Sequence, residues 1–157
     1  MAASKLFLRG MERSDFPVII SWLRNKDALN NYSFLLTMMP EDKLKDLLVK
    51  GLSLSLMNYT RKLYLVSEMK GKGSVAFHLI EDIDWRNRTA SFQSYFIKEI
   101  RNTKIEKDIN KQLSEYFFSQ LQLRKVYYYT KIKNAFSRIK PEVVFVKHIR
   151  IGDDSLD

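Results

Sequence analysis

The chain has 157 residues, 45% of them hydrophobic and 13% aromatic, which predicts one compact core and argues against intrinsic disorder except at the ends. The absence of cysteine excludes disulfide bonds, thiolate catalysis and cysteine-based zinc sites, and it favours an intracellular location. A formal net charge of +9 favours anionic partners, such as nucleic acid, acidic protein surfaces, anionic lipid or a phosphorylated cofactor.

No stretch of the sequence has the length of a membrane span, because the longest apolar-leaning run, Leu52 to Met57, is short and interrupted by serines. The amino-terminal MAASKLFLRG lacks the apolar region and cleavage site of a signal peptide. We therefore expect a cytoplasmic protein without a membrane span.

The chain is expected to begin with a short strand and two helices. The strand covers Leu6 to Leu8, and a helix follows from an N-cap at Ser14 to about Asn25. A second helix begins at Pro40 and is expected to stop at Gly51. Its apolar face is formed by three leucines: Leu44, Leu47 and Leu48.

Three strands come next and predict an antiparallel meander. They cover Leu63 to Glu68, Ser74 to about Ile80, and Thr89 to Ile97. The first connection, MKGKG, carries the glycines of a hairpin turn, and the second is EDIDWRNR.

The stretch from Thr103 to Gln122 predicts the central helix, lying on the sheet as the crossover of a β-α-β unit. Apolar residues recur there at helical spacing: Ile105, Ile109, Leu113, Phe117 and Leu121. The turn that leads into such a helix is a common phosphate-binding position.

The remaining elements are a strand from Lys125 to Lys131, a short helix from Asn134 to Lys140, and a strand from Val143 to Ile151. The order of elements predicts an α+β domain with a mixed sheet. We expect a single domain over residues 1–151 and a frayed acidic tail over residues 152–157.

Four segments in succession resemble the GNAT N-acetyltransferase superfamily, especially the branch that acetylates ribosomal-protein N-termini and its amino-sugar-modifying relatives. They are LFLRGMERSDFPVIISWLRN, EDIDWRNRTASFQSYFI, LSEYFFSQLQLRKVYYYT and KNAFSRIKPEVVFVKHIR. The resemblance implies a twisted, mostly antiparallel mixed sheet with helices on both faces. Its strands would separate into a V between the strand ending near Ile97 and the strand beginning near Lys125.

The resemblance also implies that acetyl-CoA or another acyl-CoA enters this V. Its pantetheine would pair with the strand edge at Tyr95, Phe96 and Ile97, and its pyrophosphate would lie on the amino terminus of the central helix. The candidate cofactor-binding residues here are Arg101, which falls on the starting position of the family's loop, and the three that follow it, Asn102, Thr103 and Lys104; Asn134 matches an asparagine that the family has after the next strand.

The pyrophosphate loop departs from the family pattern, because no glycine follows Arg101. Thr103 and Glu106 instead form a T-x-x-E capping box, in which each side chain accepts from the other residue's N–H. Glu106 also places a negative charge where the diphosphate would bind, and Lys104 and Lys107 offset it only in part. This degenerate loop predicts lost or weakened CoA binding.

Three residues are candidates for the acid–base chemistry of amine acylation. His78 and Glu81 lie on or after the strand that precedes Thr89 to Ile97, which itself carries no acid. A satisfied, partly buried histidine and a solvated, charge-paired turn are the alternative interpretations of His78 and Glu81. Ser137 matches a serine that some branches place where others have the thiolate-protonating tyrosine.

Between Arg124 and Arg150 the chain carries many cations and the single acid Glu142, so this segment predicts an acidic protein or nucleic-acid partner unless it is a solvated basic face. The two histidines give no metal signature, and no metal is expected.

Three functions follow. The main hypothesis is a pseudoenzyme of the GNAT fold, with weakened or lost catalysis, that binds a macromolecular partner. The alternative is an active acyl-CoA-dependent N-acyltransferase of an amino sugar or protein N-terminus. An RNA-binding module using the basic segment is the third.

Overall fold

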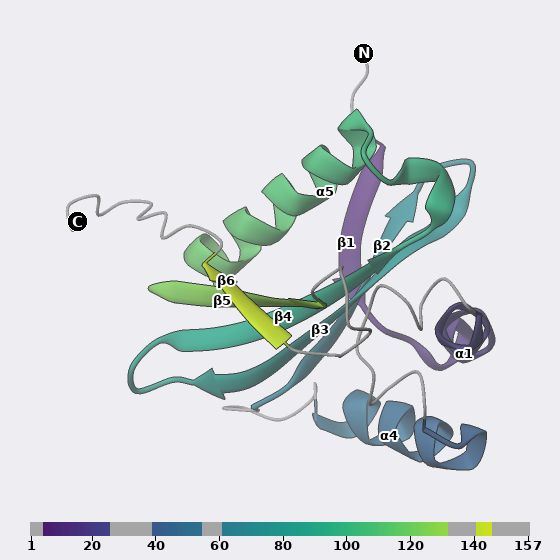
Figure 1. Ribbon diagram of the computed structural model, residues 1–157, viewed down its shortest axis with the longest axis horizontal. Coiled ribbons are helices and arrows are strands. Elements are labelled where there is room, and N and C mark those ends of the chain that lie inside the picture. Colours follow the sequence, from purple (N-terminus) through teal and green to yellow (C-terminus); the bar gives the residue numbers. More distant parts are fainter. Residues whose placement is uncertain (1–4, 26–38, 55–60, 132–140, 146–157) are drawn as a thin grey trace.

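The computed structural model describes residues 5–25, 39–54, 61–131 and 141–145. They form an α+β fold with a six-stranded sheet in the order β1-β2-β3-β4-β5-β6, in which only β4 and β5 pair in parallel (Figure 1). The expected fold class is confirmed. The strands are β1 (Leu6–Gly10), β2 (Leu63–Met69), β3 (Gly73–Asp84), β4 (Thr89–Phe96), β5 (Lys125–Lys131) and β6 (Pro141–Phe145).

Helices cover both faces of the sheet. The central helix α5 (Lys104–Glu115) lies on one face, and α1 (Phe16–Arg24) and α4 (Glu41–Leu54) lie on the other (Figure 1). The α5 face buries Ile109, Leu113 and Phe117 at the predicted helical spacing. Strand alternation divides β3 accordingly, so Phe77 and Leu79 pack against α1 and α4.

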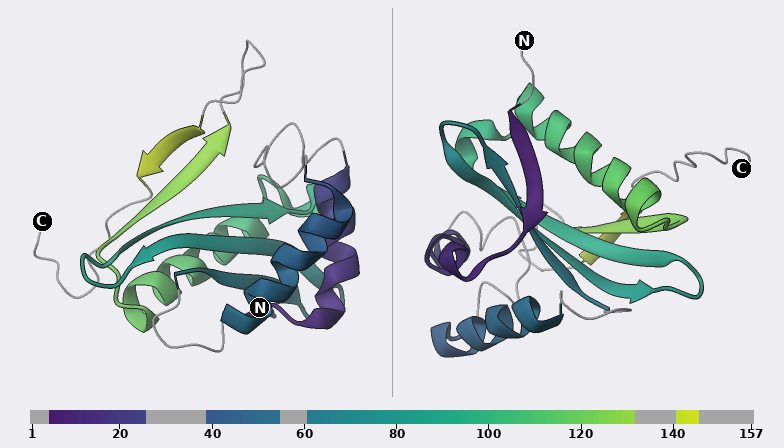
Figure 2. Two further views of the ribbon diagram at one scale, coloured as in Figure 1. Left: turned by 90° about the horizontal axis from the view of Figure 1, so that it is seen from below. Right: turned by 180° about the vertical axis from the view of Figure 1, so that it is seen from behind.

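The parallel pairing of β4 and β5 stops partway along both strands. It runs from Thr89↔Lys125 to Phe92↔Tyr128, whereas β4 continues to Phe96 in register with β3. Beyond Phe92, the β5–β6 hairpin diverges from β4 (Figure 2, left). This is the V that the family resemblance implies.

Several element ends differ from the sequence-based expectation. The helix α4 does not stop at Gly51 but continues to Leu54. A Cβ at Gly51 would lie 2.9 Å from the Tyr64 ring, so this glycine permits close packing of α4 on the sheet rather than ending the helix. The expected helix from Asn134 to Lys140, and the last strand beyond Phe145, lie outside the described residues.

The central helix also changes geometry near its end. After Glu115 it continues as a π-helical turn, η3 (Tyr116–Gln120), which buries Phe117 and Phe118. The expected single helix to Gln122 is therefore an α-helix followed by a wider turn.

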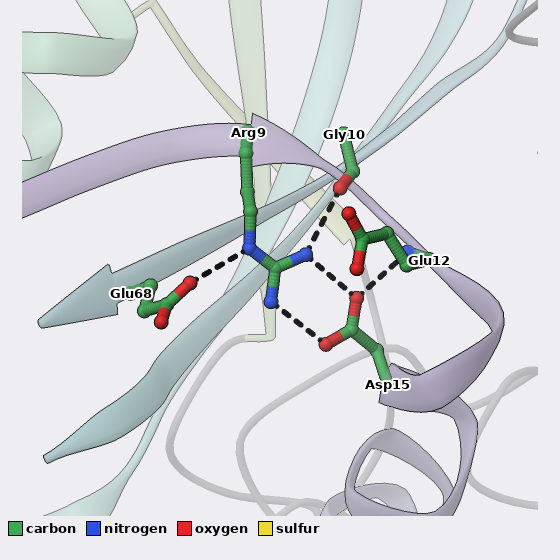
Figure 3. A network of polar contacts seen from close by, with 5 residues as sticks. All are labelled: Arg9, Gly10, Glu12, Asp15 and Glu68. Carbon is green, nitrogen blue, oxygen red and sulfur yellow. Dashed lines mark hydrogen bonds and ion pairs between the residues drawn. The ribbon is translucent and has the colours of Figure 1, made fainter.

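An ion-pair network fixes the entry into α1. Asp15, not Ser14, closes the turn, because its carboxylate accepts from the Glu12 N–H at 2.7 Å. Arg9 on β1 donates to both carboxylate oxygens of Asp15 at 2.9 Å and to Glu68 on β2 at 2.8 Å (Figure 3). Arg9 also donates to the Gly10 carbonyl, so one guanidinium joins two strands to the helix entry.

We predict that Asp15→Asn lowers the free energy of unfolding by about 2–3 kcal/mol, because it removes the bidentate partner of Arg9. The matched control Glu68→Gln should lower it by less than about 1 kcal/mol, since the Glu68 side chain is 41% exposed and that of Asp15 only 6%. Urea unfolding monitored by circular dichroism measures both. Equal losses would contradict the central role of Asp15.

The same variant has a defined pH signature. Burial alone would raise the pKa of Asp15, but hydrogen bonds from Arg9 and the Glu12 N–H more than offset it and hold the pKa below its ordinary value. The stabilisation is therefore present at neutral pH and is lost as the pH falls below the ordinary value of 3.8. Asp15→Asn should remove this part of the acid sensitivity.

Candidate functional site

The candidate site is built around residues 93–96, where β4 runs past the end of its pairing with β5. Alternation along the strand points Ser94 and Phe96 to the α5 face, and Gln93 and Tyr95 to the α1 and α4 face. The backbone edge of β4 on this side has no strand partner among the described residues. An extended ligand can pair with such an edge as an added strand does.

Tyr95 and Phe96 are brought together with Arg101. The Trp22 ring of α1 stacks on Tyr95, with ring centroids 5.2 Å apart and planes 19° apart. The Arg101 guanidinium lies 5.4 Å from the centre of the Tyr95 ring, and its Nε donates to the Phe96 carbonyl at 2.9 Å. Three of the predicted cofactor-binding residues therefore lie at the end of β4.

The turn into α5 follows directly. Asn102 has a φ of 61°, a left-handed conformation that glycine or asparagine adopts most readily. A short 3-10 turn, η2 (Lys98–Ile100), precedes it, and Thr103 is the N-cap of α5. The chain thus makes the sharp turn without glycine.

The capping bonds differ from the expected box by one residue on each side. Thr103 Oγ1 accepts from the Ile105 N–H at 3.2 Å, not from that of Glu106. The Glu106 carboxylate accepts from the Asn102 N–H at 2.7 Å, not from that of Thr103. The reason is that the Thr103 N–H already donates to the Ile100 carbonyl.

The first turn of α5 keeps part of its donor capacity. Within the described residues, the N–H groups of Lys104 and Glu106 have no hydrogen-bond partner, and that of Lys107 donates to the Thr103 carbonyl. The Glu106 carboxylate nevertheless occupies the positive end of the helix dipole. The Lys104 ammonium lies 3.4 Å from an Asp108 carboxylate oxygen, and this ion pair partly offsets its positive charge.

His78 is buried at the centre of the α5 face and bonded on both sides. Its Nε2 lies 2.7 Å from the Ser67 hydroxyl and its Nδ1 lies 2.6 Å from the Ser94 hydroxyl, so the three side chains span β2, β3 and β4. Burial lowers its pKa to about 3, which keeps the ring neutral. This matches the satisfied histidine that the sequence analysis weighed against a catalytic one, although burial is complete.

Glu81 lies on the opposite face, towards α1 and α4. It is half-buried, its Cα partner is Ser91 on β4, and the Ser91 hydroxyl lies 3.4 Å from its carbonyl oxygen. Burial raises the pKa of Glu81, the charge of Lys62 lowers it and that of Asp82 raises it, with a net upward shift. Burial and the charge of Glu81 also raise the pKa of Tyr64.

The strand register continues this row of side chains. Ser91 is the Cα partner of Tyr127 on β5, and Gln93 lies two residues further along the same face, at the divergence. Tyr127 and Gln93 are half-buried. No sequence pattern singles out these residues, because their place beside Glu81 depends on the β4–β5 register, which no local pattern encodes.

The other predicted residues are placed differently. Ile97 follows β4 and packs against the hydrophobic clusters on both faces of the sheet. Its N–H donates to the Val75 carbonyl at 3.0 Å. Asn134 and Ser137 lie outside the described residues, and their roles remain predictions. Among the described residues no group of histidine, aspartate and glutamate suits a metal ion, and no helix is both long and apolar enough to cross a membrane.

No protein-family model matches the chain, and no curated protein matches its sequence. Solved structures share its fold. A spermidine N-acetyltransferase from Vibrio cholerae in complex with CoA and spermine matches with a TM-score of 0.70 and 23% identity, over 83% of this chain and 73% of that one.

The dodecameric structure of the Vibrio cholerae enzyme in an intermediate state gives a TM-score of 0.65 and 23% identity, over 83% and 72% of the two chains. The spermidine/spermine N-acetyltransferase SpeG from the same organism, in complex with manganese ions, gives 0.63 and 23%, over 83% and 71%. At these identities the likeness establishes the fold alone, which the chain shares with these three structures.

We predict that His78 stays neutral down to about pH 3, so its ring signals in NMR should not titrate between about pH 8 and about pH 5. Because the unfolded chain takes up this proton more readily, stability should fall as the pH falls from 6.5 towards 3. His78→Leu should cost roughly 2–4 kcal/mol by leaving two buried hydroxyls unsatisfied. Adding Ser67→Ala and Ser94→Ala should recover part of that loss; a further loss would contradict the assigned bonds.

Proposed function

We propose that the chain is an acyl-CoA-dependent N-acyltransferase of a primary amine. The observation that carries the proposal is the β4–β5 pairing that ends at Phe92↔Tyr128, beyond which β4 has no strand partner on this side among the described residues. The same fold occurs in an N-acetyltransferase solved with CoA. An open edge of this kind supports an extended ligand through main-chain hydrogen bonds.

The described residues suit the pantetheine arm of acyl-CoA better than its diphosphate. The edge of residues 93–96 suits the amides of the pantetheine arm, and the helix start offers the Lys104 and Glu106 N–H groups to a diphosphate. Arg101 lies at the same end of β4. The Glu106 carboxylate opposes a diphosphate there, and its side chain must leave the Asn102 N–H to admit one.

Glu81 is the proposed general base. An amine acceptor arrives mainly as an ammonium ion, which cannot attack a thioester until it loses a proton. A half-buried carboxylate with a raised pKa accepts that proton more readily than an exposed one. The amine then attacks the thioester carbonyl carbon, the C–S bond breaks, and the departing thiolate takes a proton from water or from Ser137, the position that the family resemblance implies.

His78 takes no proton in this scheme, because it is fully buried on the other face with both nitrogens bonded. Its proposed part is structural: it holds Ser94 and therefore the β4 segment at the open edge. The acceptor is an amine, and the polyamine of the structural neighbour, an amino sugar and a protein N-terminus are the candidate classes.

One observation favours a second function. The contact between Glu106 and the Asn102 N–H favours weakened CoA binding, and a protein with such binding would act through a macromolecular partner instead of catalysis. The basic segment from Arg124 onwards is the proposed contact, and most of it lies outside the described residues. Calorimetric titration with acetyl-CoA separates the two: micromolar affinity supports the enzyme, and no binding at millimolar ligand supports the non-catalytic protein.

We predict that Glu81→Gln lowers kcat/KM for amine acylation by roughly 10²- to 10⁴-fold while leaving the Kd for acetyl-CoA unchanged. The wild-type kcat/KM should fall with decreasing pH along a limb that lies above the ordinary glutamate value of 4.5, since the pKa of Glu81 is raised. This limb should vanish in the variant. The exposed neighbour Asp82 provides the control, and Asp82→Asn should retain most activity; equal losses would remove Glu81 from the mechanism.

We predict that Glu106→Gln tightens acetyl-CoA binding by about fivefold, because it removes a like charge worth on the order of 1 kcal/mol at a protein surface. Glu115→Gln, at the far end of the same helix, removes the same charge and should leave the affinity unchanged. Calorimetry measures both. Unchanged or weaker binding in Glu106→Gln would show that its carboxylate does not oppose the ligand.

A further inference from the structure

Cationic side chains gather at the end of the sheet opposite the turn into α5. They come from the start of β2, the β3–β4 turn and the start of β5, and we call them the basic rim: Arg61, Lys62, Arg86, Arg88, Arg124 and Lys125. All are exposed except Lys62, which is half-buried. Such a cluster from separate segments produces a local positive potential.

Backbone hydrogen bonds hold these segments together. The Arg88 carbonyl accepts from the Arg124 N–H at 2.7 Å and the Lys125 N–H at 3.3 Å, and the Arg61 carbonyl accepts from the Ile83 N–H at 3.1 Å. The backbone positions that carry the rim side chains are therefore held together at this end of the sheet.

The basic rim reaches the proposed base. Lys62 acts on the carboxylate of Glu81, where its charge lowers the pKa. Lys125 is the Cα partner of Thr89, so alternation places it on the same face as Ser91 and Tyr127. From Lys62 and Lys125 the rim continues outwards to Arg86, Arg88 and Arg124.

Acidic neighbours offset the rim only in part. The Asp84 carboxylate is engaged within the turn, accepting from the Arg86 and Asn87 N–H groups at 3.0 and 2.9 Å and from the Asn87 side chain at 2.9 Å. Asp82 is exposed beside it, and Glu81 faces the site. A polycationic acceptor such as spermine would meet net repulsion on this approach.

We propose that the acceptor is the terminal amine of a peptide whose following residues are acidic, lying along the basic rim with its amine at Glu81. This rests on the proposed N-acyltransferase function. From Ser91, the Cα partner of Glu81, to Arg88 the rim side of β4 extends roughly 10 Å, the length of about three residues of extended chain. That length suits a peptide, whereas a sugar phosphate would contact only the cations nearest Glu81.

The test uses three peptides with the same first two residues, followed by four aspartates, four serines or four lysines. Acetyl transfer, followed by thiol release, should give a kcat/KM for the aspartate peptide roughly tenfold or more above that for the lysine peptide at low salt. High salt should reduce this ratio towards one, because exposed charges are screened. Equal kcat/KM values at low salt, or a preference for lysine, would overturn the proposal.

Variants locate the effect on the molecule. Lys62→Glu with Lys125→Glu should abolish or invert the preference while leaving the Kd for acetyl-CoA unchanged. The control Lys72→Glu with Lys111→Glu makes the same change of net charge at exposed lysines of the β2–β3 turn and α5, outside the rim, and should retain the preference. Loss of the preference in both, with circular dichroism unchanged, would show that net charge and not the basic rim is responsible.

A binding measurement keeps the inference separate from the reaction. Fluorescence anisotropy of a labelled aspartate peptide does not need turnover, so weakening by Lys62→Glu with Lys125→Glu supports the rim even if no transfer occurs. In that case only the N-acyltransferase function would fail. Displacement of the peptide by an oligoribonucleotide at much lower concentration than by an unlabelled aspartate peptide would instead assign the rim to nucleic acid and overturn the proposal.

Discussion

The arrangement of the whole site depends on a parallel strand pairing that stops halfway. Four pairs join β4 to β5, and then β4 continues with β3 while β5 continues with β6. A complete pairing would satisfy the β4 backbone from within the sheet and leave no edge for a ligand. The packing on both faces, through α5 on one and α1 and α4 on the other, supports a sheet that can remain open at this point.

The turn that follows β4 shows a conflict between folding and ligand binding. The Thr103 hydroxyl accepts from the Ile105 N–H and the Glu106 carboxylate from the Asn102 N–H, and each bond stabilises the start of α5 in the absence of ligand. The Glu106 bond also uses the position where an anion would gain most from the helix dipole. A glycine-rich loop leaves those N–H donors to the ligand. In this chain, side chains of the protein already accept hydrogen bonds from part of them.

Much of the fold follows from local sequence pattern, and the limits have physical causes. The strand from Lys125 to Lys131 matches its prediction at both ends because β-branched and aromatic residues fill it. Gly51 misled the prediction of α4, because a glycine that makes room for Tyr64 cannot be distinguished locally from one that ends a helix. Glu81 was identified as a candidate by residue type, but its row with Ser91 and Tyr127 depends on long-range register.

The buried histidine bridge has a consequence for how the sheet finds its alignment. A slip by two residues keeps every apolar side chain on its own face of the sheet, so the apolar pattern alone does not exclude it. His78 instead needs hydroxyl groups at two defined positions, Ser67 on one side and Ser94 on the other. A slip of β3 by one residue would turn the imidazole to the opposite face and leave both hydroxyls in an apolar interior. The bridge therefore fixes the register of β2, β3 and β4, and β4 is the strand whose edge lies beyond the end of the pairing with β5.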